Sequence, residues 1–351
     1  MYLLVMKQLI TMLLIVLSGF IVAKCFKVGD KEQKFLSKLL LYFINPCLVV
    51  SSFNLDFDLL KLKQLGFVAA ISLIVHGLMI LLGLLFTLSK DEAKRDLNIL
   101  DRVGTAFTNC GFVGIPLIRG VFGDEGVFYL MGYLIIFNLL IWTYGYHQLS
   151  GTINLKKIIT NPNIIAVCIG LVIFCLPVTL PDFIAKPVSM IGDLNTATSM
   201  ILLGILFADF KKPEISKQVL TEGEETKVSG GQVKDTDEKT KTSGAYFIFR
   251  IAKFSFVRLV ICALVNLIFL TLIFKGLSAL HFFSCLGNVD AMRMMIFVTL
   301  ICSMCPAATS ISSLACVFDK DTSYASLMVT ITSVVCMVTI PTFVAIAEKV
   351  I

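Results

Sequence analysis

Hydrophobic residues follow one another along this chain in long runs, separated by short polar stretches. Each run holds about 20 mostly apolar residues, the length that an α-helix needs to cross the hydrocarbon core of a membrane. The pattern predicts an all-α membrane protein with ten transmembrane helices. The predicted spans are residues 4–23, 35–53, 65–88, 102–122, 126–147, 162–179, 188–209, 246–274, 292–317 and 323–347.

The overall composition agrees with this pattern. Hydrophobic residues make up 57% of the 351 residues and charged residues only 15%, whereas soluble domains carry about 25% charged residues. One segment, residues 211–244, is rich in lysines and acids and has almost no large apolar residues after Leu220. It cannot bury enough apolar surface to fold by itself, and a flexible cytoplasmic loop is expected there.

Positive charges are distributed unevenly between the predicted loops. Lysines and arginines are concentrated in loops that follow odd-numbered spans, such as 24–34 and 90–102, and are sparse in the others. Since positively charged loops stay in the cytoplasm, both termini are expected on the outer side of the plasma (inner) membrane. Arg250, Lys253 and Arg258 at the start of the eighth span are expected to snorkel toward the headgroups.

Two short stretches of sequence recur. "FNLDF" (53–57) ends the second span and "LFADF" (206–210) ends the seventh, while "VFGDEGVFYL" (121–130) follows the fourth span and "VFDKDTSYASL" (317–327) follows the ninth. The chain is therefore predicted to contain two copies of five helices. Because five is odd, the second copy is inverted, as in many secondary transporters. The predicted repeats are residues 1–155 and 156–351, the second of which contains the loop 211–244.

The fourth and ninth spans contain residues that interrupt helices. The fourth holds Asn109, Gly111, Gly114 and Pro116, and the ninth holds Pro306 followed by several hydroxyl residues. Non-helical backbone at membrane depth is tolerated only where it is buried in protein or lines a cavity. Half-helices that restart after Pro116 and Pro306 present free N–H groups and a partial positive charge. With few acids in the apolar interiors, two such ends predict a site for a small organic anion.

Polar residues near the interruptions are the candidates for substrate contact. Asn109 offers an amide donor to a carboxylate, unless its side chain caps the helix break. Asn138 is expected in the same cavity, with a hydrogen bond between helices as the alternative. Thr309 and Ser310 donate from the opposite half-helix or bond back to their own carbonyls, and Asn45 is expected to line the cavity wall. Pro116 and Pro306 complete the predicted substrate-binding set.

Little in the sequence points to catalysis. His76 lies inside a span and either carries a proton, since histidine titrates near neutrality, or is buried and neutral. Cys302 and Cys305 form a CxxC pair without a second ligand pair, so neither a metal nor another cofactor is expected. No GxSxG accompanies a serine and no GxxxxGK[ST] occurs. The protein is therefore not expected to be an enzyme or an ATPase.

Four segments resemble motifs of the auxin efflux carrier family, which has bacterial and plant members. They are "FINPCLVVSSF" (43–53), "TNCGFVGIPLIRGVFGDEG" (108–126), "NLLIWTYG" (138–145) and "CPAATSISSLACVF" (305–318). The resemblance covers nearly the whole chain apart from 211–244, and the short loops fit a bacterial-type member. It implies ten helices in a 5+5 inverted repeat with broken, crossing helices 4 and 9. It also implies a scaffold of spans 1, 2, 6 and 7, a moving transport domain of the other spans, and a homodimer.

The resemblance further implies that Asn109 contacts the substrate carboxylate. Thr108 stands where plant members, which export indole-acetate, carry a proline, and hydroxyl residues stand near Pro306 where they carry an asparagine. The expected substrate is therefore a small carboxylate, such as malate, malonate or an auxin-like acid.

The sequence thus predicts a secondary active or potential-driven transporter of small organic anions that works by alternating access. Its expected partners are the anion, the lipid bilayer and, for coupling, H⁺ or Na⁺, with no nucleic acid. The alternative is a membrane-embedded ligand sensor that signals through the 211–244 loop.

Overall fold

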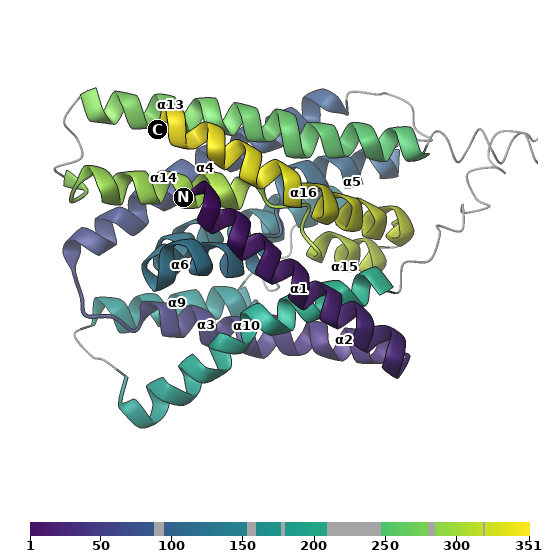
Figure 1. Cartoon of the computed structure of the whole chain (residues 1–351), viewed down its shortest axis with the longest axis horizontal. Coiled ribbons are helices and arrows are strands. Elements are labelled where there is room, and N and C mark those ends of the chain that lie inside the picture. The colour runs from purple at the N-terminus through teal and green to yellow at the C-terminus, as the bar shows by residue number, and fades with distance from the viewer. Residues whose placement is uncertain (88–94, 153–158, 177–179, 209–246, 280–284, 319) are drawn as a thin grey trace, which may run out of the picture.

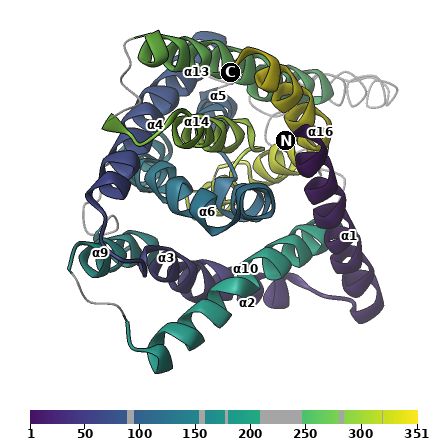
Figure 2. The ribbon, with the colours of Figure 1, turned by 60° about the vertical axis from the view of Figure 1, so that its left-hand side comes forward.

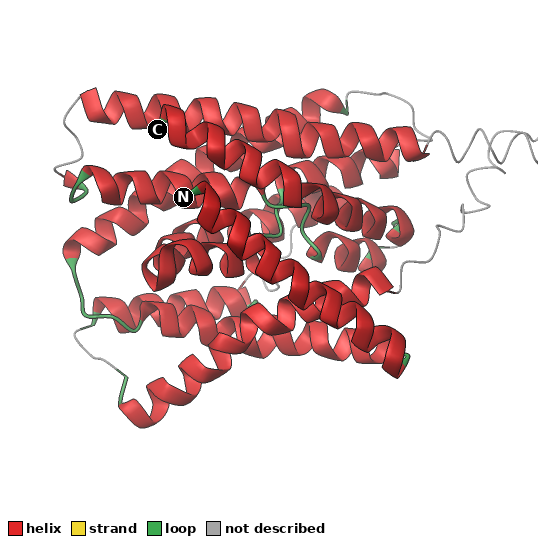
Figure 3. Ribbon diagram, in the orientation of Figure 1, coloured by secondary structure: helices red, strands yellow, loops and turns green. Residues whose placement is uncertain are grey.

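In the described residues, all regular secondary structure is helical (Figure 3). One isolated β-bridge joins two of the segments that connect helices. The computed structural model describes residues 1–87, 95–152, 159–176, 180–208, 247–279, 285–318 and 320–351, so the predicted loop 211–244 lies outside the described residues. The α-helices are α1 (Tyr2–Phe26), α2 (Asp30–Leu39), α3 (Asn45–Phe53), α4 (Leu59–Phe86), α5 (Arg95–Ala106), α6 (Ile115–Leu140), α7 (Tyr146–Ser150), α9 (Pro162–Cys175), α10 (Asp182–Ala208), α13 (Cys262–Ala279), α14 (Val289–Met304), α15 (Ser310–Val317) and α16 (Thr322–Val350). The π-helical turns are η1 (Leu40–Ile44), η3 (Cys110–Gly114), η4 (Ile141–Gly145) and η5 (Val257–Ile261).

The predicted spans correspond to helices of unequal length. Seven helices in the described part of the chain are long and apolar enough to cross a membrane, and the sixth predicted span forms only the 14-residue α9. The fourth and ninth spans are interrupted, and the second part of the fourth continues into the fifth as one helical segment, Cys110–Ser150. Gly123 bends this segment with a φ of 67°, which glycine adopts without steric cost. The all-helical fold is confirmed, and the division into ten spans stays a prediction.

The helices form two groups that lie side by side (Figures 1 and 2). In one group α1 packs along α10, and α3 contacts both α9 and α10. In the other group α4 contacts α5 and α6, α14 contacts α6 and α13, and α15 contacts α16. The two groups meet mainly at α6, which contacts α1, α3 and α9. An interface between separately packed groups therefore passes beside α6.

The sequence of α1 shows how the first group is held together. The residues of α1 that are buried recur every three or four positions and form one stripe along the helix, whereas Leu3, Ile10 and Leu14 on the other face stay exposed, as expected for side chains that face lipid. Gly204 of α10 lets the two backbones approach closely, because a Cβ atom there would lie 2.0 Å from the Val16 carbonyl oxygen. The buried stripe consists of Val5, Leu9, Met12, Val16, Gly19 and Ala23.

A buried ion pair ties the second group together and corrects an expectation. Arg250 does not snorkel toward the headgroups; its Nη2 donates to Asp101 Oδ2 of α5 at 2.6 Å and to Asn98 Oδ1 at 2.7 Å. Tyr324 of α16 donates its hydroxyl to the other carboxylate oxygen of Asp101, also at 2.6 Å. Lys253 fits the expectation better, since its ammonium group lies at an exposed position near the Phe86 carbonyl oxygen.

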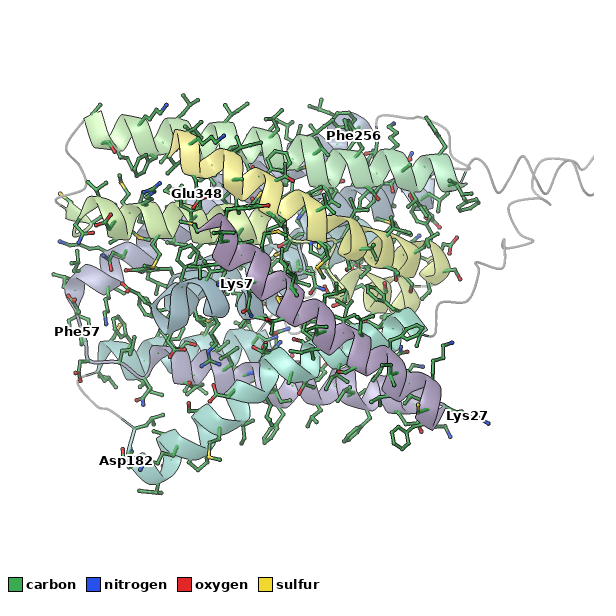
Figure 4. The ribbon with its side chains drawn as sticks, viewed as in Figure 1. Lys7, Lys27, Phe57, Asp182, Phe256 and Glu348 are labelled. Atoms are coloured by element: carbon green, nitrogen blue, oxygen red, sulfur yellow. The ribbon has the colours of Figure 1, made fainter. Side chains whose placement is uncertain are left out.

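Both chain termini lie at the same end of the molecule. The amino group of Met1 forms an ion pair with Glu348 of α16 at 2.6 Å, and Figure 4 shows Glu348 beside the start of α1, whereas Lys27, just past the end of α1, lies at the far end. On the outer surface Phe256 is exposed, as a lipid-facing residue is expected to be.

We expect Gly204→Ala to destabilise the protein, because the added methyl group has no room against the backbone of α1. Overpacking of this kind costs about 1–3 kcal/mol, so the midpoint of thermal unfolding in detergent should fall. Gly66→Ala in α4 is the matched control, since a Cβ atom there meets nothing within 4 Å. Equal unfolding midpoints for the two variants would contradict the close packing of α1 on α10.

Candidate binding site at two broken helices

The first interruption lies earlier in the chain than the sequence predicts. Helix α5 ends at Ala106, residues 107–109 are not helical, and the helix restarts at Cys110 as the π-turn η3. Pro116 is the seventh residue of the restarted segment Cys110–Ser150, directly after the π-turn η3, and the helix continues through it. The prediction that the half-helix begins after Pro116 is therefore wrong, and Asn109 is the residue that immediately precedes the restart.

The second interruption lies where it was predicted. Helix α14 ends at Met304, and α15 begins at Ser310, with Pro306 between them. Pro306 cannot donate a backbone hydrogen bond, and the chain at Cys305 turns to an extended conformation with ψ 154°. The proline thus coincides with a true end of the helix.

The two interruptions meet and satisfy each other's backbone groups. Thr108 and Ala307 form an antiparallel β-bridge. The Asn109 N–H donates to the Pro306 carbonyl oxygen at 2.7 Å, and the Ala308 N–H donates to the Phe107 carbonyl oxygen at 3.1 Å. Unpaired backbone groups are costly in lipid, and this pairing explains how two helices can break at membrane depth. The segments that cross here, residues 107–109 and 305–309, are called the crossover below.

A cavity of about 130 Å³ opens beside the crossover. Five of the predicted site residues line it, and they come from both helix groups. Pro116 and Pro306 are not among the lining residues: the carbonyl oxygen of Pro116 accepts a hydrogen bond from Gln8, and that of Pro306 belongs to the crossover. The predicted residues that line the cavity are Asn45, Asn109, Asn138, Thr309 and Ser310.

Asn109 has a side-chain donor that bonds to no group of the described residues. The residue is 4% exposed, its Nδ2 is buried without a hydrogen-bond partner, and its side chain makes no capping bond to η3. The alternative role as a cap of the helix break is therefore excluded. A buried amide N–H without a partner costs free energy unless a ligand or water accepts its hydrogen bond. Asn109 is therefore the lining residue that we expect to donate a hydrogen bond to a ligand.

The other predicted residues have more varied surroundings. Asn138 Nδ2 donates to the Leu134 carbonyl oxygen of its own helix at 2.9 Å, which differs from the predicted bond between helices. Asn45 Oδ1 accepts a short hydrogen bond from Asn195 Nδ2 of α10, so Asn45 is held within the first helix group. Thr309 is the N-cap of α15, and its side chain makes no capping hydrogen bond.

Sequence reasoning missed two lining residues at the start of α9. Asn161 Oδ1 caps α9 by accepting from the Asn163 and Ile164 N–H groups, and Asn163 Oδ1 is buried without a partner. Both line the cavity opposite the crossover. The motif "NPN" (161–163) was a usable signal, because asparagine before proline favours a capped helix start.

Arg258 was also missed, because it was expected to snorkel. It is fully buried, and its Nη2 donates to the carbonyl oxygens of Ser303 and Cys305 at 2.9 and 2.8 Å, at the end of α14. Arg258 lies 11 residues inside the helix Phe247–Ala279, roughly 16 Å along its axis. From this depth an arginine side chain is too short to reach the headgroups at the start of the helix.

His76 does not line the cavity. Its Nδ1 lies 2.8 Å from the Ser72 carbonyl oxygen of the same helix, and its ring packs 4.7 Å from the ring of Tyr133. It is fully buried among aromatic side chains. Of the two roles expected for His76, these contacts favour that of a histidine buried in the protein interior.

A second hollow, of about 550 Å³, lies at the opposite end of the same interface. It is lined by Leu180, which follows α9, whereas the first cavity is lined by Asn161, which precedes α9. Before the bend of α6 at Gly123, the first cavity is lined by Ile115 and the second from Arg119, one helical turn later. After the bend the order reverses: the second is lined as far as Tyr129 and the first again from Leu134. The Nη1 atom of Arg119 forms an ion pair with Asp193 of α10 at 2.7 Å, which joins the two helix groups at this end.

Comparison with known proteins supports the resemblance seen in the sequence. The family model described as membrane transport protein matches residues 4–154 and 148–344, nearly the whole chain. No curated protein matches the chain. The resemblance to the auxin efflux carriers is confirmed at the level of the family. This chain belongs to the membrane transport protein family.

Proposed function

We propose that this protein is a secondary transporter of small organic anions and that the cavity beside the crossover is its substrate site. The observation that carries the proposal is the Nδ2 of Asn109, a buried donor without a partner among the described residues, on a residue that lines the cavity beside two helix restarts. The N-termini of η3 and α15 add free N–H groups and partial positive charge on the same side. A carboxylate accepts such hydrogen bonds with both of its oxygens.

The size of the cavity supports a short carboxylate as the substrate. Sites for drug-sized ligands have volumes of about 300–1,000 Å³, and this cavity has about 130 Å³. The lining is otherwise amides, hydroxyls and apolar side chains such as Phe137 and Trp142. Malonate or malate fits this description better than an acid with an indole ring.

The two hollows support alternating access. They lie at opposite ends of the interface between the helix groups and are separated by about one turn of α6. We propose that the group containing the crossover moves against α1, α3, α9 and α10, which form the scaffold. Opening one hollow while closing the other then exposes the crossover to each side in turn.

The proposal includes ten spans in a 5+5 inverted repeat. The two matched stretches of the family model, 4–154 and 148–344, divide close to the predicted boundary at residue 155. The placement of both termini at one end supports an even number of crossings. The interruptions at corresponding positions of the two halves support an inverted relation.

We expect Asn109→Ala to lower the uptake of labelled malonate into proteoliposomes at least tenfold, because the carboxylate loses a buried donor. Asn266→Ala is the matched control: Asn266 is a buried asparagine in α13 whose side-chain atoms also have no partner, and it does not line the cavity. Uptake should be measured with imposed H⁺ and Na⁺ gradients and with a membrane potential. Unchanged uptake in Asn109→Ala, or no uptake of any carboxylate by the wild type, would refute the proposed site or function respectively.

We expect Arg119→Gln to open the second hollow more often, since it removes the ion pair between α6 and Asp193. A cysteine placed at Ser51, which lines this hollow, should then react severalfold faster with a membrane-impermeant thiol reagent. Lys186→Gln serves as the control, because Lys186 lines the same hollow but pairs with Asp182 of its own helix. If the two variants react at the same rate, the Arg119–Asp193 contact does not hold this end closed.

A further inference from the structure

Arg258 is completely buried and has no carboxylate partner in the part of the chain that the structure describes. Its side chain is 0% exposed, and none of the ion pairs among the described residues involves it. Its Nη1 lies 3.4 Å from Met79 Sδ, and its Nε has no hydrogen-bond partner. Two backbone carbonyls, those of Ser303 and Cys305, are its only oxygen acceptors among the described residues.

The other buried arginine of this helix, Arg250, has a carboxylate partner. Arg250 is balanced by the carboxylate of Asp101. A guanidinium that is removed from water without a counter-charge is strongly destabilising, and ionisable residues inside a membrane span mark functional sites by default. The charge of Arg258 therefore calls for a partner that the described residues do not supply.

Capping the end of α14 does not require a positive charge. At the other interruption, the Phe107 carbonyl oxygen accepts its hydrogen bond from the backbone N–H of Ala308, a neutral donor. A neutral amide side chain has two N–H donors and can serve two carbonyl oxygens in the same way. The charge of Arg258 thus serves something besides the hydrogen bonds that it makes.

We propose that Arg258 is the fixed positive charge that balances one carboxylate of the substrate bound at the crossover. This inference rests on the proposed function. Arg258 donates to the Cys305 carbonyl oxygen, and the carbonyl oxygen of the next residue, Pro306, accepts the N–H of Asn109, so Arg258 and Asn109 bind neighbouring residues of the crossover. Charges interact more strongly where water is excluded than they do in water. Arg258 does not line the cavity, and it acts as a positioning residue.

A single buried positive charge determines the net charge of the preferred substrate. A carboxylate with a single negative charge balances Arg258, a neutral ligand leaves the guanidinium uncompensated, and a dianion adds a second buried negative charge. The site should therefore select anions with one negative charge. A dicarboxylic acid would bind with one of its two groups protonated or otherwise neutral.

Three ligands with the same skeleton test this inference: malonamide, malonamate and malonate, which at pH 8 carry zero, one and two negative charges. Dissociation constants should be measured with the purified full-length protein. In the wild type, malonamate should bind at least tenfold more tightly than either of the other two. Arg258→Gln should reduce the preference for malonamate over malonamide to less than about twofold. Arg258→Lys should keep it, because the positive charge remains.

Lys253→Gln is the matched control, since it removes one exposed positive charge from the same helix and should leave the preference intact. A tenfold preference that persists in folded Arg258→Gln would overturn the inference, as would its equal loss in Arg258→Lys and Arg258→Gln. If Arg258→Gln does not fold, the dissociation constants of the wild type and of Arg258→Lys provide the test. Tighter binding of malonate than of malonamate by these two proteins would overturn the inference that the site selects one negative charge. Failure of the wild type to bind any of the three, together with no carboxylate uptake, would instead overturn the proposed function.

Discussion

Backbone hydrogen bonds between two interrupted helices are the interaction on which the centre of this protein depends. A helix that breaks at membrane depth leaves N–H and C=O groups without water to receive them. Here the break at residues 107–109 and the break at 305–309 supply each other's partners through the Thr108–Ala307 bridge and its flanking hydrogen bonds. Neither break is stable alone, and their pairing places two helix starts beside one cavity.

The cavity beside the crossover lies between the two helix groups. The crossover belongs to the group that contains α5, α6, α14 and α15, whereas Asn45 and Asn161 reach the cavity from the other group. In the proposed mechanism, a ligand held in the cavity contacts both groups, and relative motion of the groups changes which hollow leads to it. Arg258 lies on the crossover side, and its charge therefore stays with the crossover and Asn109 rather than with the scaffold.

Sequence reasoning predicted the features that depend on local composition. The apolar runs predicted the helices, and Pro306 marked the second break. A proline alone does not fix a break, because Pro187 and Pro341 lie inside α10 and α16 without ending them. The first break was placed at Pro116, but the restarted helix runs through that proline. The break lies at Phe107–Asn109, where backbone partners from the ninth span are available. Such long-range pairing has no local signature. For the same reason the burial of Arg250 and Arg258 could not be read from their own helix.

The most direct test of the central claim is the distance between a bound carboxylate and the side chain of Asn109. Solid-state NMR of the protein in lipid bilayers, with ¹⁵N-labelled asparagine side chains and ¹³C-carboxyl malonate, measures the dipolar coupling between the two. We predict a coupling that corresponds to a hydrogen bond, with a nitrogen–oxygen separation of about 2.9 Å, and that disappears when residue 109 is alanine. Saturating malonate without such a coupling, or with a coupling that survives the substitution, would contradict a substrate site at the crossover.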